Sequence, residues 1–98
     1  MTPEGRVKRK IKNLLDSYGD VIYYYMPVPS GYGRRTVDYL GCANGRFFVI
    51  EAKAEGKEVT GLQQGTLDDV LAAHGVGFVV DGDESLAKVK FWLERVIK

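Results

Sequence analysis

The chain has 98 residues, a formal net charge of +1, and hydrophobic and charged fractions of 45% and 28%, which fit one globular domain (residues 1–98) and exclude a second core. No apolar run approaches the ~20 residues of a membrane span, and the charged N-terminal segment is unlike a secretion signal. The single cysteine, Cys42, excludes an intramolecular disulfide and a cysteine-based metal site. A cytoplasmic protein without membrane association is predicted.

Two elements are predicted in the first 26 residues. Residues 2–19 have the pattern of an amphipathic helix, with Thr2 as its N-cap and Pro3 at its first position. The apolar stripe of this helix consists of Val7, Ile11, Leu14 and Leu15. Residues 21–26 are β-branched and aromatic, which favours a strand, and the Pro/Gly-rich residues 27–35 favour a loop.

A β-hairpin is predicted over residues 36–53. Asn44-Gly45 is the preferred pair for a two-residue type I′ turn and has strand-forming residues on both sides. With this pair as the loop, residues whose numbers sum to 89 lie opposite one another, so Asp38 faces Glu51. Lys53 lies two residues beyond Glu51 and therefore shares the same face.

Three further elements complete the prediction: a helix over residues 59–75, a short buried strand over 76–82 and an amphipathic helix over 83–98. The apolar members of the first of these helices are Leu62, Leu67, Val70 and Leu71. The inward residues of the last helix are Leu86, Val89, Trp92, Leu93 and Val96. The order is α-β-β-β-α-β-α, and the crossover from the third to the fourth strand predicts that these two are parallel. The fold class is therefore α/β, with a mixed four-stranded sheet flanked by helices.

The facing carboxylates are the main candidate site. Two carboxylates opposed within a sheet repel each other, and a divalent cation between them removes that cost. Asp38 and Glu51 are therefore candidate ligands of Mg²⁺ or Mn²⁺, with Lys53 able to orient a water or neutralise a phosphate oxygen. The alternative is a salt-bridge cluster on a solvated face. Against it, the apolar residues 47–50 predict a strand that is covered on both faces.

These residues resemble a known family. An aspartate followed by Glu51-Ala52-Lys53, together with the element order, resembles the PD-(D/E)xK nucleases. Residues 4–86, including the "TGLQ" start of the second helix, are similar to the VRR-Nuc (virus-type replication-repair nuclease) domain in its small stand-alone form. Val37 departs from the pattern by replacing the proline of the superfamily name, at a position that shapes backbone rather than ligating metal. The resemblance implies a restriction-endonuclease-like core and a metal-dependent DNA endonuclease that hydrolyses phosphodiester bonds, acting as a junction resolvase on branched DNA.

The resemblance also implies roles for individual residues. Asp38 and Glu51 would be metal ligands, together with the backbone carbonyl of Ala52. Lys53 would activate or position the attacking water.

Two further residues match the family but have structural alternatives. Glu4 matches an additional acidic metal ligand on the first helix, although an acid in a first helical turn is also favoured by the helix dipole. Gln63 matches a catalytic-site glutamine at the start of the second helix, although it stands three residues after Thr60, the spacing of a capping box. His74 is interpreted as a helix C-terminal residue.

Basic residues are expected to bind DNA phosphates, although such clusters also occur as solvated faces. The candidates are Arg6, Lys8, Arg9, Arg34, Arg35 and Lys57. Residues 23–25, all tyrosines, are expected in the core and on the strand surface, with one able to stack on a base. So small a nuclease offers little surface for a duplex, which favours a homodimer acting on branched or duplex DNA in a bacterial or phage-infected cell. The competing hypotheses are a non-catalytic nucleic-acid-binding module and an accessory subunit whose site a partner completes.

Overall fold

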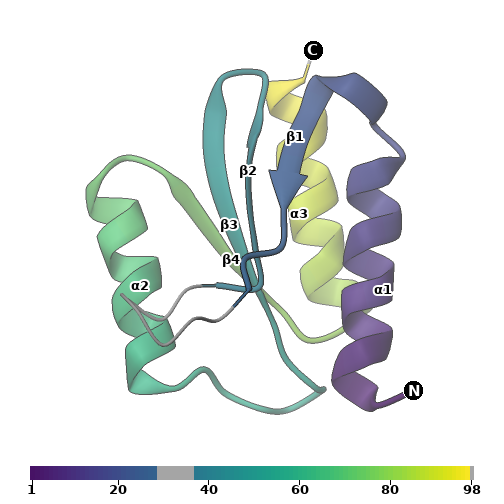
Figure 1. The fold of residues 1–98 in the computed structure, drawn as a ribbon, viewed down its shortest axis with the longest axis vertical. Helices are drawn as coiled ribbons and strands as arrows, with labels where there is room; N and C mark the ends of the chain where they lie inside the picture. The colour runs from purple at the N-terminus through teal and green to yellow at the C-terminus, as the bar shows by residue number, and fades with distance from the viewer. Residues whose placement is uncertain (29–36, 98) are drawn as a thin grey trace.

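The computed structural model describes residues 1–28 and 37–97, in which helices lie on both sides of a four-stranded sheet (Figure 1). The elements in chain order are α1 (Pro3–Asp16), the short 3₁₀ helix η1 (Gly19–Val21), β1 (Ile22–Tyr25), β2 (Tyr39–Ala43), β3 (Arg46–Ala52), α2 (Gly61–Ala72), β4 (Val76–Val80) and α3 (Asp83–Val96). The predicted order of the main elements is confirmed. Arg34 and Arg35, two of the expected DNA contacts, lie outside the described residues.

The sheet has the strand order β1-β2-β3-β4, antiparallel between the first three strands and parallel between β3 and β4. The predicted α/β class with a mixed sheet is therefore confirmed. At the hairpin turn, Asn44 and Gly45 have φ angles of 49° and 82°, as a type I′ turn requires. Leu40 pairs with Val49, so the register in which opposed residue numbers sum to 89 is also confirmed.

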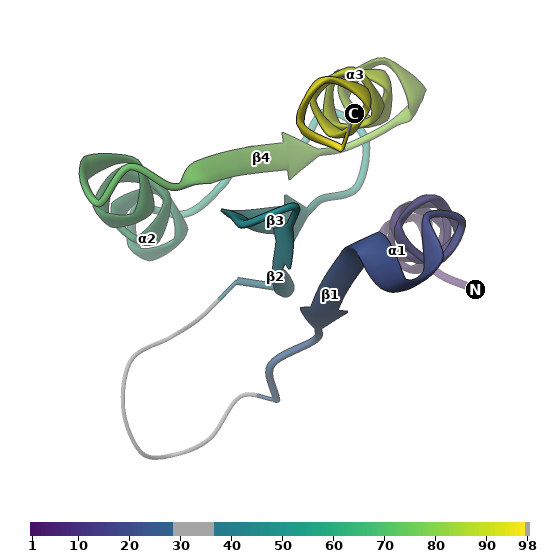
Figure 2. The same cartoon turned by 90° about the horizontal axis from the view of Figure 1, so that it is seen from above.

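The two faces of the sheet are covered by different helices, as Figure 2 shows: α1 and α3 lie on one side, and α2 lies on the other, over β3 and β4. The hydrophobic core lies between the sheet and the α1/α3 pair. Its buried members are Val7, Ile11, Leu15, Ile22, Tyr39, Ala43, Phe48, Ile50, Ala52, Val80, Val89 and Leu93. No helix within residues 1–28 and 37–97 has the length and apolar character needed to cross a membrane.

The start of α1 follows the sequence prediction, and its end does not. The Thr2 hydroxyl accepts a hydrogen bond from the Gly5 N–H at 3.0 Å, and Pro3 occupies the first turn. The helix ends at Asp16, three residues before the predicted end. Ser17 terminates it, because its hydroxyl donates to the Leu14 carbonyl at 2.6 Å and satisfies one of the final helical acceptors.

Helix α2 differs from a simple apolar stripe. Leu62 and Leu71 are exposed, and the buried residue of this helix is Gln63. At about 100° per residue, Gln63 and Val70 lie nearly on one line along the helix, with Leu62 and Leu71 about 90° to either side of it. The polar side chain of Gln63 is therefore turned toward the sheet, and that orientation brings it to the carboxylates described next.

Candidate metal and active site

Asp38 and Glu51 come together at one end of the β2–β3 hairpin. The paired residues end at Tyr39 and Ile50, and Asp38 and Glu51 are the next residues, close enough for their carboxyl groups to interact. The Asp38 carboxylate is fixed there because its Oδ2 accepts a hydrogen bond from the Ala52 N–H at 2.8 Å. A backbone donor at the end of β3 thus holds an acid that precedes β2.

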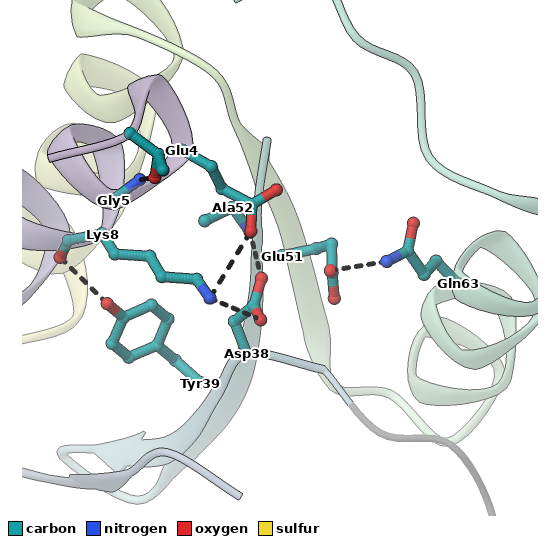
Figure 3. A network of polar contacts seen from close by, with 9 residues as sticks. Glu4, Gly5, Lys8, Asp38, Tyr39, Glu51, Ala52 and Gln63 are labelled. Carbon is teal, nitrogen blue, oxygen red and sulfur yellow. Dashed lines mark hydrogen bonds and ion pairs between the residues drawn. The ribbon is translucent and has the colours of Figure 1, made fainter. Parts of the chain in front are cut away.

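Glu51 is a buried acid with one unsatisfied oxygen. Glu51 is only 4% exposed, and its Oε1 accepts a hydrogen bond from Gln63 Nε2 at 2.7 Å (Figure 3). Its Oε2 is buried and accepts no hydrogen bond from the described residues. Buried polar atoms are nearly always partnered, so an orphaned carboxylate oxygen facing a second acid is an arrangement that a bound cation completes.

The electrostatics of Glu51 reflect this environment. Burial, followed by the negative charge of Asp38, raises the pKa of the Glu51 carboxyl from 4.5 to about 7, while the Lys53 ammonium acts in the opposite direction. Without metal, Glu51 therefore holds its proton to a higher pH than an ordinary glutamate does. A carboxylate must be deprotonated to ligate a metal, so cation binding at this site releases that proton.

Gln63 serves two structural roles at once. Its backbone N–H donates to the Thr60 hydroxyl at 3.2 Å, and its side-chain Oε1 accepts from the Thr60 N–H at 2.9 Å, which completes a capping box. The Nε2 of the same amide donates to Glu51. The two alternatives for this glutamine, a helix cap and a contact with the sheet, are both correct.

Lys8 contacts the acid pair, whereas the sequence predicted that it would bind DNA phosphates. Its Nζ lies 3.5 Å from Glu4 Oε2 and 3.5 Å from Asp38 Oδ1, so one ammonium group bridges two carboxylates (Figure 3). The Tyr39 hydroxyl donates to the Lys8 carbonyl at 2.9 Å and ties this turn of α1 to the sheet. The pairing with Glu4 was visible as an i, i+4 spacing on a helix. The contact with Asp38 depends on how α1 packs.

The expected metal ligands are only partly assembled. Asp38 and Glu51 lie together, whereas the Glu4 carboxylate is connected to Asp38 only by the Lys8 ammonium, which forms ion pairs with both. Within residues 1–28 and 37–97, no group of three or more His, Cys, Asp or Glu side chains is arranged to hold a metal ion. Two carboxylates still suit Mg²⁺, which commonly keeps several waters and takes one or two acids together with substrate phosphates. The Ala52 carbonyl would be a further oxygen ligand.

Lys53 follows the acid pair directly. Its backbone N–H donates to the Val80 carbonyl at 2.9 Å, which anchors the end of β3 to β4. Its side chain is partly buried, and its positive charge is close enough to lower the pKa of Glu51 against the effect of burial. The position predicted for Lys53, on the face of the acids, agrees with this electrostatic contact.

The remaining candidates are more scattered. Arg6, Arg9 and Lys57 are exposed, and Lys57 lies in a turn closed by its N–H bond to the Ala54 carbonyl at 3.0 Å. His74 has a φ of 69° directly after α2, so its expected role at the helix C-terminus is confirmed. These side chains are not gathered at the acid pair.

Comparison with known proteins adds no constraint: the chain matches no protein-family model and no curated protein. The candidate site therefore depends on its own geometry. That geometry supplies two opposed carboxylates, one orphaned carboxylate oxygen and an adjacent ammonium group. Such a set can bind a hard cation and compensate charge on a neighbouring anion.

Proposed function

We propose that this chain is a metal-dependent endonuclease that hydrolyses phosphodiester bonds in DNA. The observation that supports the proposal is the buried Glu51 carboxylate, which interacts with the Asp38 carboxylate and whose Oε2 accepts no hydrogen bond from the described residues. Lys8 and Lys53 offset the charge of the two acids only in part, and burial of the ionised Glu51 carboxylate still costs folding free energy, which a ligand of positive charge would offset. Mg²⁺ or Mn²⁺ is the ligand that fits carboxylate oxygens.

Each residue of the site has a role in this proposal. Asp38 and Glu51 hold the metal, and the Ala52 N–H and the Gln63 amide orient the two carboxylates toward it. The metal, when bound, supplies Lewis-acid stabilisation and lowers the pKa of a bound water. Lys53 places a positive charge where a phosphate oxygen gains negative charge during hydrolysis.

The finer assignment is part of the same proposal. We propose a PD-(D/E)xK-type core, which the element order and the position of the acid pair at the end of the hairpin support. The small size supports a homodimer with two active sites, and branched DNA is the proposed substrate. A free Cys42 is consistent with the cytoplasmic location that we propose for the protein.

The test is a cleavage panel of linear duplex, flapped, four-way and single-stranded DNA, with Mg²⁺ or Mn²⁺, run on the wild type and on Asp38→Asn. We expect cleavage by the wild type and a loss of at least about a thousandfold in the variant, because the asparagine cannot supply a charged ligand oxygen. Asparagine retains an acceptor for the Ala52 N–H, so circular dichroism should show an unchanged fold.

Asp83→Asn is the matched control, since Asp83 forms an exposed pair with Lys10 at 2.7 Å, on α3 and outside the acid pair. It should cleave as the wild type does. If no DNA form is cut and calorimetry detects no uptake of either metal, the nuclease proposal fails.

One observation favours a second candidate function. The Lys8 ammonium already compensates part of the Asp38 charge in the absence of metal. In a protein that binds nucleic acid without cleaving it, alone or as an accessory subunit, the Lys8 ammonium would take the place of a metal ion beside Asp38. Metal uptake without cleavage of any DNA form would favour the accessory subunit. DNA binding without metal uptake would favour the non-catalytic module.

A further inference from the structure

We propose that the part of the sheet beside the acid pair that α2 does not cover, with Tyr23 and Tyr25 exposed on it, binds single-stranded nucleic acid whose unpaired bases stack on these two tyrosines. The inference deepens the proposed function by naming an unpaired strand as the substrate region next to the cleavage site. Only the cleavage of a bound strand depends on the proposed nuclease function. Binding itself can be tested without metal.

The two tyrosines project away from the core. Along β1, Ile22 is buried and Tyr24 packs against the core, with its hydroxyl donating to Asp16 at 2.5 Å. Because side chains alternate along a strand, Tyr23 and Tyr25 point to the opposite face, and they are 70% and 48% exposed. The helix on that face, α2, packs on β3 and β4 and is displaced from β1 (Figure 2).

The register places the tyrosines in line with the acid pair. Directly opposed residues share a face, so two cross-strand rows can be defined: Tyr23–Cys42–Phe47 and Tyr25–Leu40–Val49. They are called the open rows here because their β1 members are exposed, although Val49 at the far end is buried. The next row on the same face is the acid pair, Asp38 and Glu51. Tyr25 therefore lies one row from the candidate site and Tyr23 lies two rows from it.

The spacing of these rows suits an extended single strand. Two residues along a strand span about 6.6 Å. This is about twice the ~3.4 Å rise per nucleotide of a DNA strand. Neighbouring bases would therefore be separated from one another and stacked on protein instead. Aromatic side chains on a sheet bind unpaired bases in this way, with little dependence on sequence because every base has a π face.

The charge beyond the open rows can contact a phosphate backbone. The open rows carry no charged side chain, and Lys53 follows the acid pair at the end of β3, whereas Arg46 alternates to the opposite face with Phe48. Arg46 and Phe47 also line a cavity of about 600 Å³ between the hairpin and α2. Phe47, 45% exposed, belongs both to this cavity and to the first open row. A strand lying on the rows thus contacts an uncharged aromatic surface first and reaches the Lys53 ammonium beyond the acid pair.

A second copy of the chain is the competing occupant of this face. We favour nucleic acid because the exposed tyrosines lie on the face of the acid pair, on the rows next to Asp38. A second copy seated on them would cover the approach to the acid pair. The two occupants are separated by the experiment that follows.

The experiment measures fluorescence anisotropy of an end-labelled oligodeoxythymidine of about 12 nucleotides with the full chain in EDTA, a length within the range of one small binding domain. Tyr23→Ala and Tyr25→Ala should each weaken binding by roughly tenfold, and the double variant by roughly a hundredfold. Tyr23→Phe and Tyr25→Phe should bind as the wild type does, because the stacking ring is kept. Phe91→Ala removes an aromatic residue that is 61% exposed on α3, across the sheet, and should have no effect.

The outcomes separate the surface from the catalytic proposal. Unchanged affinity in the double alanine variant, with an unchanged melting temperature, overturns the inference. It is also overturned if the double variant converts a dimer to a monomer in sedimentation without changing DNA affinity, because the face then joins two copies. Tyrosine-dependent binding without metal-dependent cleavage supports the surface and removes the nuclease. Metal-dependent cleavage together with binding that does not depend on the tyrosines supports the nuclease and overturns the surface.

Discussion

The two faces of β3 differ although they belong to one seven-residue strand. Toward α1 and α3, Phe48, Ile50 and Ala52 are fully buried, and the face is apolar after the exposed Arg46 at its start. Toward α2, Phe47 is nearly half exposed, Val49 is buried, and Glu51 is a buried acid with an unsatisfied oxygen. One face stabilises the fold, and the other holds polar groups in positions that are unfavourable without a ligand.

This difference shows how a 98-residue domain can carry an acid pair in its interior. Domains of this kind are stable by roughly 5–15 kcal/mol, so one uncompensated buried charge is a large fraction of the total. The apolar face offsets that cost and keeps the strand straight and rigid. The predictions below test whether stability and chemistry are divided between the faces in this way.

The largest expected effect comes from truncating the apolar face. Phe48→Ala should lower the free energy of unfolding by about 3–5 kcal/mol, because it leaves a cavity against the Trp92 ring, whose centroid lies 5.9 Å away. Phe47→Ala, one residue earlier and on the other face, should cost about 1 kcal/mol. Urea denaturation of both variants measures the difference. Equal losses would mean that the two faces contribute alike to stability.

The second prediction concerns the pH dependence of the metal-free protein. The pKa of Glu51 is raised from 4.5 to about 7 in the folded state, so its contribution is fully present below about pH 4.5 and is lost as the pH rises through 7. Ionising it costs the fold on the order of 3 kcal/mol. Thermal denaturation in EDTA should therefore show falling stability between pH 5 and pH 8.

Glu51→Gln should abolish most of this slope and be the more stable protein at pH 8. The exposed Glu58→Gln is the control and should retain the wild-type slope. If Glu51→Gln kept the wild-type dependence of stability on pH, ionisation of Glu51 would not be the cause of that dependence.

The smallest predicted effect concerns the cation that bridges α1 and the acid face. Lys8→Met should lower metal-free stability at pH 8 by about 1 kcal/mol, since it removes partly exposed ion pairs to Glu4 and Asp38. It should also tighten Mn²⁺ binding several-fold in calorimetry, because the negative potential at Asp38 is then uncompensated.

Lys12→Met is the matched control, since Lys12 forms an exposed pair with Asp16 at 2.7 Å on the same helix. It should leave stability nearly unchanged and Mn²⁺ binding unchanged, because solvent screens this exposed pair. Unaltered Mn²⁺ affinity in Lys8→Met would place Lys8 outside the metal site.

Sequence reasoning found the acid pair because the deciding signal was local. A single Asn44-Gly45 turn sets the register of the hairpin, and the register alone brings Asp38 opposite Glu51. The apolar pattern predicted that residues 47–50 are buried on both faces of the strand, but Phe47 is 45% exposed. Periodicity describes one strand and cannot state how far a neighbouring helix extends over it.

The chain by itself determined the elements, the helix caps at Thr2 and Thr60 and the hairpin register, because each depends on residues a few positions apart. Tertiary packing decided what surrounds the acids. It turned Gln63 toward Glu51, brought the Lys8 ammonium to Asp38 and left Glu51 Oε2 without a hydrogen bond from any residue of 1–28 or 37–97. These contacts join separate elements, and their geometry follows from the docking of α1 and α2 on the sheet rather than from any local pattern.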